Sequence, residues 1–170
     1  GRIRSAFLMT EKGTSSSKVL KISVSSNKNS KGNWVINGVK WFASGAGDPR
    51  TSVWFVMCKT GNDKTRPYRN HSLLLLDAKK AIASGRAKVV RPLTIFGYDD
   101  APHGHCEIAF DNYEVPLEDM DFSILGATER GFELIQSRLG PGRIHHCMRL
   151  IGQAEFALYR AVHRANHRVI

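Results

Sequence analysis

Two short loops of small polar residues are the first places where this chain could do chemistry. TEKGTSSS, at residues 10–17, and SGAG, at residues 44–47, each follow a predicted strand. Hydroxyl groups and backbone N–H groups beside small side chains can hydrogen-bond a ligand. Neither loop has the GxGxxG or P-loop spacing of a phosphate site. The residues alone therefore leave open a ligand site or a pair of ordinary turns.

Histidine and cysteine cluster twice, which raises the question of a metal. The first cluster is HGHC at residues 103–106, where His103 and His105 would share a strand face with little room, and the second is HHC at residues 145–147. No CxxC or HExxH spacing occurs. Three consecutive residues of a helix also point in different directions. We therefore expect no metal site.

Arginines near the C-terminal end are a third candidate. Arg160, Arg164 and Arg168 recur at four-residue steps, so a helix would align them on one ridge. Spacing alone favours a solvated helix face, because cations are stabilised near a helix C-terminus, and leaves a phosphate contact as the alternative. We find no nucleophile elbow, no Ser-His-Asp order and no suggestive pair of carboxylates.

The elements that would position these residues are mostly strands. Residues 5–10 and 19–25 are predicted strands, and the second alternates between apolar and polar side chains. Residues 34–47, WVINGVKWFASGAG, are predicted to form a hairpin, because Asn37-Gly38 tolerates the positive φ of a tight turn. About eight strands are expected in all, the others being SVWFVMC, HSLLLL, KVVRPL, HCEIAF and NYEV.

The hydrophobic period changes in the C-terminal segment. Apolar residues recur at three- and four-residue steps from Ile144 to Val169, beside a second apolar stripe. An unbroken helix over 144–170 would be roughly 40 Å long, and nothing else in the chain is helical enough to cover it. We therefore predict an all-β barrel of about eight antiparallel strands at 1–121, followed at 122–170 by the first long helix of a truncated α-helical bundle domain.

Composition limits the classes of function. The chain has 170 residues, three cysteines without a CxxC, and a formal net charge of +10. Cysteines that are few and odd in number favour a reducing compartment over a disulfide framework. The longest apolar run, LLLL at residues 73–76, is far too short to span a bilayer. The charge favours polyanionic ligands such as nucleotides, coenzyme A, nucleic acid or acidic lipid.

The order of several motifs is more specific than any one of them. FLMTEKGTSSS, WVINGVKWFASGAG, VVRPLTIFGY, FDNYEVP and ERGFELIQSRLGPGR follow one another, before a long helix that closes in HRVI. Over nearly all of its length the chain resembles the middle and early C-terminal part of an acyl-CoA dehydrogenase. RLGPGRIHHCMR is similar to the branch that includes the mammalian family members numbered ten and eleven.

The resemblance implies an FAD-dependent oxidoreductase of lipid metabolism. Such an enzyme removes an α proton and a β hydride from an acyl-CoA, forms the 2-enoyl-CoA, and passes electrons to an electron-transfer flavoprotein. It further implies a homo-oligomer, with neither a nucleic-acid partner nor a membrane span. The implied location is the mitochondrial or peroxisomal matrix in a eukaryote and the cytoplasm in a bacterium.

The resemblance also assigns cofactor residues. They are Phe7, Met9, Thr10, Ser16, Phe42, Ala43, Ser44 and Arg168. Thr10 would donate a hydrogen bond to the pyrimidine end of the flavin, where reduction puts negative charge. Phe42 would pack against the isoalloxazine ring, and Ser44 would give its hydroxyl to flavin N5. The Asn-Gly turn would fix the register that aims Ser44. Arg168 would reach the FAD of a neighbouring subunit near its phosphates.

On the substrate side, the resemblance implies Ser16, Gly140 and Arg143, but no catalytic residue in this chain. The family's base is a glutamate, expected beyond Ile170, and the alternative position on the helix is Gly142 here. A general base typically supplies about 10²- to 10⁴-fold of rate. We therefore expect negligible dehydrogenase activity from the chain by itself.

Three positions depart from the family pattern, and other functions stay open. Lys12 replaces a proline, Ser17 replaces a frequent aspartate, and Phe42 replaces a frequent tryptophan. The alternatives are an acyl-CoA oxidase or nitroalkane oxidase on the same fold, a nucleic-acid-binding flavoprotein, and a non-catalytic acyl-CoA- or protein-binding barrel.

Overall fold

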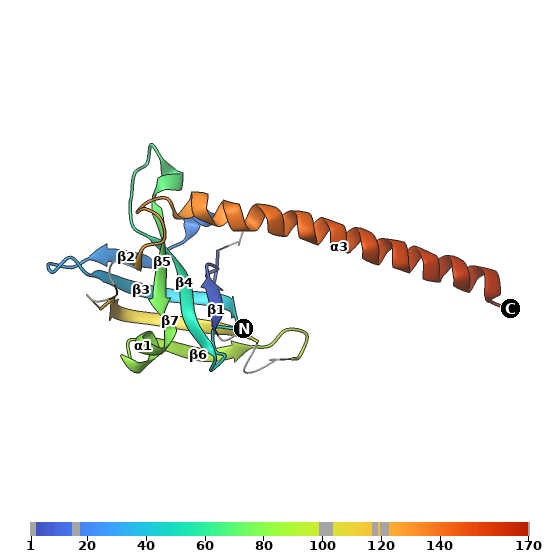
Figure 1. Ribbon diagram of the computed structural model, residues 1–170, viewed down its shortest axis with the longest axis horizontal. Helices are drawn as coiled ribbons and strands as arrows, with labels where there is room; N and C mark the ends of the chain where they lie inside the picture. Colours follow the sequence, from blue (N-terminus) through green and yellow to red (C-terminus); the bar gives the residue numbers. More distant parts are fainter. Residues whose placement is uncertain (1–2, 15–17, 99–103, 117–118, 120–122, 170) are drawn as a thin grey trace. The chain divides into compact units, whose positions relative to one another are not determined.

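The structure is a computed structural model that describes residues 3–14, 18–98, 104–116, 119 and 123–169 (Figure 1). The chain divides into two units, Gly1–Phe132 and Glu133–Ile170. This division lies later in the chain than the one expected between residues 121 and 122. A β unit followed by one long helix confirms the predicted fold class.

The first unit is built on one mixed sheet, which has seven strands among the described residues. The strands are β1 (Arg4–Leu8), β2 (Ser25–Lys28), β3 (Trp34–Ser44), β4 (Thr51–Lys59), β5 (His71–Asp77), β6 (Ala87–Leu93) and β7 (His105–Glu114). They pair in the order β1-β4-β2-β3-β7-β6, and β5 also pairs with β4. β1 and β2 run parallel to β4, so the pairing is not wholly antiparallel as expected.

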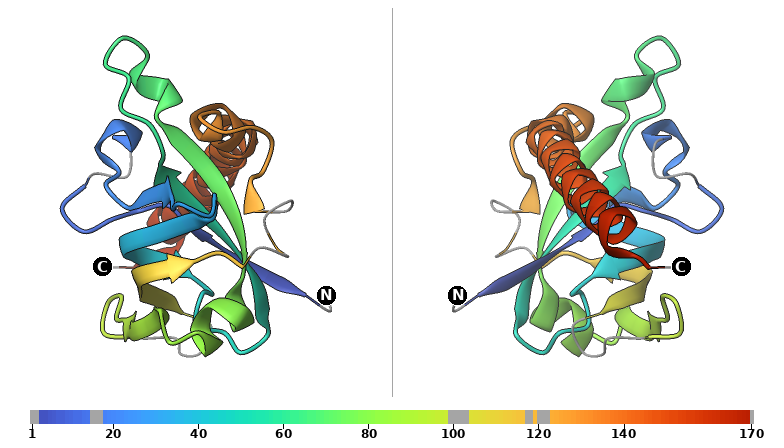
Figure 2. Two further views of the ribbon diagram at one scale, coloured as in Figure 1. Left: turned by 90° about the vertical axis from the view of Figure 1, so that its left-hand side faces the viewer. Right: turned by 90° about the vertical axis from the view of Figure 1, so that its right-hand side faces the viewer.

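The sheet bends around a single core. In Figure 1, β1, β4 and β5 run across the direction of β2, β3, β6 and β7, and the two views of Figure 2 show the same strong twist. Both halves contribute buried side chains: Leu8, Trp54 and Leu74 come from one half, and Ile36 and Ile108 come from the other. This shared core gives the sheet the barrel-like form that the sequence predicted.

The predicted hairpin at Asn37-Gly38 is wrong, because β3 continues through both residues. Asn37 lies opposite Ser25 of β2, and Gly38 lies opposite Phe110 of β7. Gly38 has a φ of 127°, and the register with β7 shifts between Ile36 and Gly38, which marks a β-bulge. A bulge needs the same backbone freedom as a tight turn, so the Asn-Gly signal fits both.

Residues 19–25 are also not the predicted strand. Val19–Lys21 forms a short 3-10 helix, η1, and the strand β2 begins only at Ser25. The N–H groups of Ser23 and Val24 donate to the carboxylate of Glu11, at 2.7 and 2.9 Å, instead of to a neighbouring strand. The apolar-polar alternation correctly indicates that Ile22 and Val24 are buried, but Leu20 is exposed and the backbone hydrogen bonds are not those of a strand.

Two further elements of the first unit were not predicted. The helix α1 (Ala78–Ala83) begins at Asp77, whose side chain accepts hydrogen bonds from the N–H groups of Lys79 and Lys80. The 3-10 helix η2 spans Pro67–Arg69.

The second unit consists of the long helix α3 (Gly131–His167), of which residues 131 and 132 belong to the first unit. It begins earlier than the expected residue 144 and contains Pro141. Eight apolar residues along it each expose more than half of their surface: Ile144, Met148, Leu150, Ile151, Phe156, Leu158, Tyr159 and Val162. These residues lie within the wide apolar arc that the periodicity predicted for this helix.

Candidate functional site

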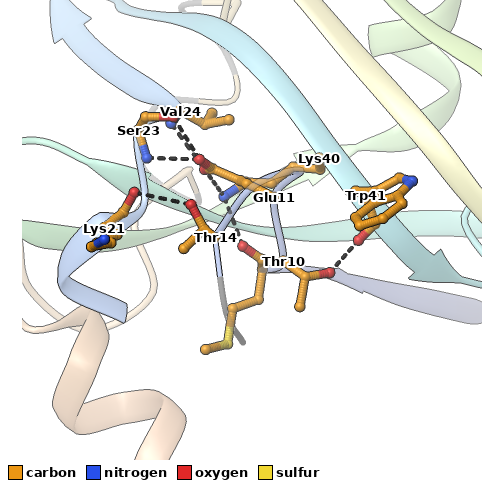
Figure 3. Close-up of polar contacts among 9 residues, drawn as sticks. Thr10, Glu11, Thr14, Lys21, Ser23, Val24, Lys40 and Trp41 are labelled. Carbon is orange, nitrogen blue, oxygen red and sulfur yellow. Dashed lines mark hydrogen bonds and ion pairs between the residues drawn. The ribbon is translucent and has the colours of Figure 1, made fainter. Parts of the chain in front are cut away.

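The loop that follows β1 is attached to β3 at Thr10. The backbone carbonyl of Thr10 accepts from the N–H of Trp41 at 2.8 Å, and its hydroxyl donates to the Trp41 carbonyl. Figure 3 shows this side-chain contact at the end of β1. A carbonyl can only accept, so the one hydroxyl hydrogen of Thr10 is used and the hydroxyl oxygen is left to accept from a ligand. This differs from the donor role that the resemblance implies for Thr10.

A buried ion pair fixes the same loop one residue later. The ammonium group of Lys40, on β3, lies 2.9 Å from the carboxylate of Glu11, and their side chains are 0% and 4% exposed. Lys40 also donates to the Met9 carbonyl at 3.1 Å. The Glu11 carboxylate accepts three more hydrogen bonds, from the N–H and hydroxyl of Ser23 and the N–H of Val24 (Figure 3). Residues 9–11 are therefore held between β3 and the segment before β2.

The electrostatics of this pair follow from its burial. Burial raises the pKa of Glu11, but the charge of Lys40 and the hydrogen bonds from Ser23 and Lys40 outweigh it, so the net pKa lies below its ordinary value. Burial lowers the pKa of Lys40, against the attraction of the neighbouring groups. Burial also raises the pKa of the nearby Cys58 thiol to about 12, so Cys58 is not a nucleophile at neutral pH.

A second bulge in β3 exposes the aromatic residue of the predicted flavin site. The register with β7 shifts between Lys40 and Ala43, and Phe42 has a φ of 53°. The extra residue interrupts strict alternation, so Lys40 and Ala43 are both buried whereas Phe42 and Ser44 are both exposed. A bulky residue at positive φ is uncommon, and such outliers concentrate at functional sites.

Ser44 ends β3 and faces a histidine that sequence reasoning weighed only as a metal ligand. Ser44 pairs in register with His105 of β7, and its hydroxyl oxygen lies 2.7 Å from Nδ1 of that histidine. The rings of Phe42 and His105 have centroids 6.1 Å apart. His105 meets Ser44 only because of the β3–β7 register. The residues next to either one in the sequence do not predict this contact.

The SGAG loop itself offers fewer ligand donors than the sequence suggested. The N–H of Gly45 donates to the carbonyl of Gly104, that of Ala46 to the carbonyl of Ala43, and that of Asp48 to the carbonyl of Gly45. The N–H of Gly47 lies against the sulfur of Cys106. These bonds make the loop a structural turn, so its ligand chemistry rests on the Ser44 hydroxyl.

The other residues predicted for the first unit are placed less specifically. Phe7 lies in β1 opposite Phe55, with ring centroids 6.3 Å apart. Met9 follows β1 and is partly buried. Ser16 and Ser17 lie outside the described residues, as does His103. Among the residues that the structure describes, no three His, Cys, Asp or Glu side chains are grouped to hold a metal ion.

Three predicted residues belong to the second unit. Arg143 donates to the side-chain carbonyl of Gln136 at 3.1 Å, about two turns earlier on the helix. A side chain at Gly140 would meet no other atom within 4 Å. Arg168 follows the end of α3, and its N–H donates to the carbonyl of Arg164.

No helix in the described part of the chain is both long and apolar enough to cross a membrane.

Comparison with protein families identifies a close similarity. Residues 6–113 match the family model described as acyl-CoA dehydrogenase, middle domain. The chain is 47% identical over 165 residues to a probable acyl-CoA dehydrogenase of Arabidopsis thaliana, with 97% of this chain and 19% of that protein covered. It is 42% identical over 170 residues to human acyl-CoA dehydrogenase family member 11, with 99% of this chain and 21% of that protein covered. The chain thus spans about a fifth of the length of these relatives.

Solved structures show the same fold. A Mycobacterium abscessus protein assigned as an acyl-CoA dehydrogenase superposes with a TM-score of 0.78 at 38% identity, with 99% of this chain and 39% of that one covered. Butyryl-CoA dehydrogenase from Megasphaera elsdenii superposes with a TM-score of 0.71 at 23% identity, with 98% of this chain and 39% of that one covered. The second likeness concerns the fold alone.

Proposed function

We infer the function from one premise: this chain belongs to the acyl-CoA dehydrogenase family. We propose that it is the flavin-binding β domain and the first bundle helix of an FAD-dependent acyl-CoA dehydrogenase. The whole enzyme would desaturate an acyl-CoA thioester to the 2-enoyl-CoA and pass the electrons to an electron-transfer flavoprotein. FAD, when bound, supplies the acceptor for the substrate's β hydride.

The polar groups along β3 fit a flavin, and this fit carries the proposal. The Thr10 oxygen is free to accept because its hydrogen is used by Trp41. That suits the N–H of a flavin's pyrimidine ring. Phe42 exposes 38% of its surface beside the Trp41 ring, with centroids 4.5 Å apart, and so offers a flat apolar contact. The Ser44 hydroxyl, farther along the same strand, would hydrogen-bond N5.

The remaining roles are extensions of the same proposal. Ser16, Gly140 and Arg143 would lie on the acyl-CoA side, and Arg168 would contact the FAD phosphates of a second copy in a homo-oligomer. The general base would be a glutamate outside this chain. We further propose a mitochondrial or peroxisomal matrix location in a eukaryote, or the cytoplasm in a bacterium.

The first test is the visible absorption of the full-length protein, recorded before and after anaerobic addition of acyl-CoAs of several chain lengths. We expect a flavin band that bleaches with one class of acyl-CoA. A flavin band that no acyl-CoA bleaches would contradict the dehydrogenase activity and favour the nitroalkane or nucleic-acid alternatives. A protein without flavin would contradict the roles of Thr10, Ser44 and Arg168.

A pair of phenylalanine variants tests the site itself. Phe42 and Phe96 are both exposed and both have positive φ, at 53° and 51°. We expect Phe42→Ala to weaken FAD binding about tenfold or more, because a buried aromatic contact is lost. Phe96→Ala, which removes a more exposed ring (98% against 38%) from the turn after β6, should leave FAD binding within about twofold. Equal effects would contradict the placement of the flavin at β3.

A further inference from the structure

We propose that His105 is a positioning residue that makes Ser44 a hydrogen-bond donor. In this view Nδ1 of His105 carries a proton and donates it to the Ser44 oxygen, which frees the hydroxyl hydrogen of Ser44 to point outward from β3. The inference rests on the proposed function in that it takes the outward partner to be flavin N5. The direction of the Ser44–His105 bond is inferred from that partner, but it can be measured without FAD.

The geometry of the pair is set by the backbone. Ser44 and His105 are directly opposite in the β3–β7 register, and Gly45, the first residue after β3, donates its N–H to the carbonyl of Gly104 at 2.8 Å. This backbone bond fixes the spacing of the two side chains, whose Oγ and Nδ1 atoms are 2.7 Å apart. At that distance one of the two atoms must donate to the other.

The direction of this bond decides what Ser44 can offer a ligand. A serine hydroxyl has a single hydrogen, whereas an imidazole nitrogen donates or accepts according to its proton. If Nδ1 is bare, Ser44 donates to it and can only accept from a ligand. If Nδ1 is protonated, Ser44 accepts from it and can donate to a ligand. The N5 atom of an oxidised flavin has a lone pair and no hydrogen, so only the second arrangement complements it.

The Thr10 hydroxyl shows how the hydrogen-bond partner of a hydroxyl decides whether it can donate to a ligand or only accept from one. Its hydroxyl also lies beside β3, but its partner is the Trp41 carbonyl, which can only accept. The Thr10 oxygen is therefore left as an acceptor, whatever the conditions. The two hydroxyls would then present opposite hydrogen-bonding characters: an acceptor at the Thr10 end and a donor at the Ser44 end. His105 is the residue that creates this difference.

A double-variant cycle tests whether His105 acts through Ser44. In the full-length protein loaded with FAD, we expect Ser44→Ala and His105→Ala each to weaken FAD binding about tenfold and to shift the flavin absorption and midpoint potential in the same direction. His105→Ala should have no further effect in the Ser44→Ala background. His105→Asn keeps an amide donor near Nδ1 and should restore values close to wild type.

A control and a second readout keep the outcomes separate. Glu107 lies two residues along β7 from His105, so its side chain is on the same face of the strand, and Glu107→Ala should leave the flavin unchanged. The ¹⁵N chemical shifts of histidine-labelled protein, with His105 assigned from the His105→Ala variant, report directly which ring nitrogen is protonated.

The results distinguish failure of this inference from failure of the proposed function. A bare Nδ1 in the ¹⁵N spectrum would overturn the inference, with or without FAD. So would a His105→Ala effect that persists when Ser44 is already alanine, or no effect at all while Ser44→Ala changes the flavin. Absence of FAD from the wild-type protein would overturn the proposed function and the assignment of N5, while a protonated Nδ1 would still support the direction of the Ser44–His105 bond.

Discussion

The two ends of the candidate site are held in different ways. At the Thr10 end, a buried ion pair between Glu11 and Lys40 and the hydrogen bonds around it attach the loop to β3. At the Ser44 end, an exposed hydroxyl meets one half-buried histidine. We therefore expect the first end to stabilise the fold as well as contact the proposed flavin, and Ser44 at the second end to contact the proposed flavin without stabilising the fold.

Removing the buried ammonium group of Lys40 should have the largest effect on stability, because the Thr10 end depends on it. We expect Lys40→Met to lower the free energy of unfolding by about 3–5 kcal/mol, because it leaves the Glu11 carboxylate buried without its countercharge. Urea titration followed by tryptophan fluorescence measures the change, since Trp41 lies beside the network.

The neighbouring exposed Lys12 provides the control for this measurement. Lys12→Met should change the free energy of unfolding by less than about 0.5 kcal/mol. The double variant Lys40→Met, Glu11→Gln should recover part of the loss, because an uncharged amide is less costly to bury than an unpaired carboxylate. A double variant no more stable than Lys40→Met would show that the charge is not the cause.

A substitution at the Gly38 bulge should have the next largest effect on the free energy of unfolding. A Cβ at this position would lie 2.8 Å from Cγ2 and 3.1 Å from Cα of Val24, and φ is 127°. We expect Gly38→Ala to cost about 2–4 kcal/mol, from backbone strain together with the clash. Gly13 has a similar positive φ of 79° with nothing within 4 Å, so Gly13→Ala should cost only the strain, about 1–2 kcal/mol. Equal losses would show that the approach to Val24 is unimportant.

Gly38 also shows why part of the fold was predictable and part was not. The order of motifs and the apolar periodicity identified a β unit followed by a long helix. The Asn-Gly pair correctly indicated positive φ at Gly38 but not at Asn37, and local sequence does not distinguish a turn from a bulge. That choice depends on pairing with Phe110, which lies far away in the sequence.

The candidate site was predictable to a similar extent. Thr10, Phe42 and Ser44 were predicted from family motifs, and the structure brings them along β3, although their contacts with a flavin stay predictions. Lys40 was not predicted, because a lysine is ordinarily exposed and is buried here only by meeting Glu11 from a distant segment. His105 was missed as a partner of Ser44 for the same reason: its role depends on strand register rather than on its neighbours in sequence.

Acid should lower the free energy of unfolding by protonating Glu11, the buried carboxylate at the Thr10 end of the site. The pKa of Glu11 is lower in the folded chain than its ordinary value of 4.5. The ionised group therefore stabilises the fold above pH 4.5, and this stability is lost as pH falls through the folded-state pKa. Unfolding free energies measured between pH 7 and pH 3 should fall less steeply for the Lys40→Met, Glu11→Gln double variant than for the wild type. Parallel curves would mean that other carboxylates account for the acid sensitivity.

The smallest effects give the sharpest comparison of the two ends. Thr10→Val keeps the shape of the side chain but removes the hydrogen bond to the Trp41 carbonyl, so we expect it to lower the free energy of unfolding by about 1 kcal/mol. Ser44→Ala removes an exposed hydroxyl and should change it by less than about 0.5 kcal/mol. In the FAD-loaded protein, Ser44→Ala should change the flavin spectrum more than Thr10→Val does, because only Ser44 is proposed to contact N5. If Ser44→Ala destabilised the chain as much as Thr10→Val, the serine would be a structural residue, and its freedom to serve the ligand alone would be refuted.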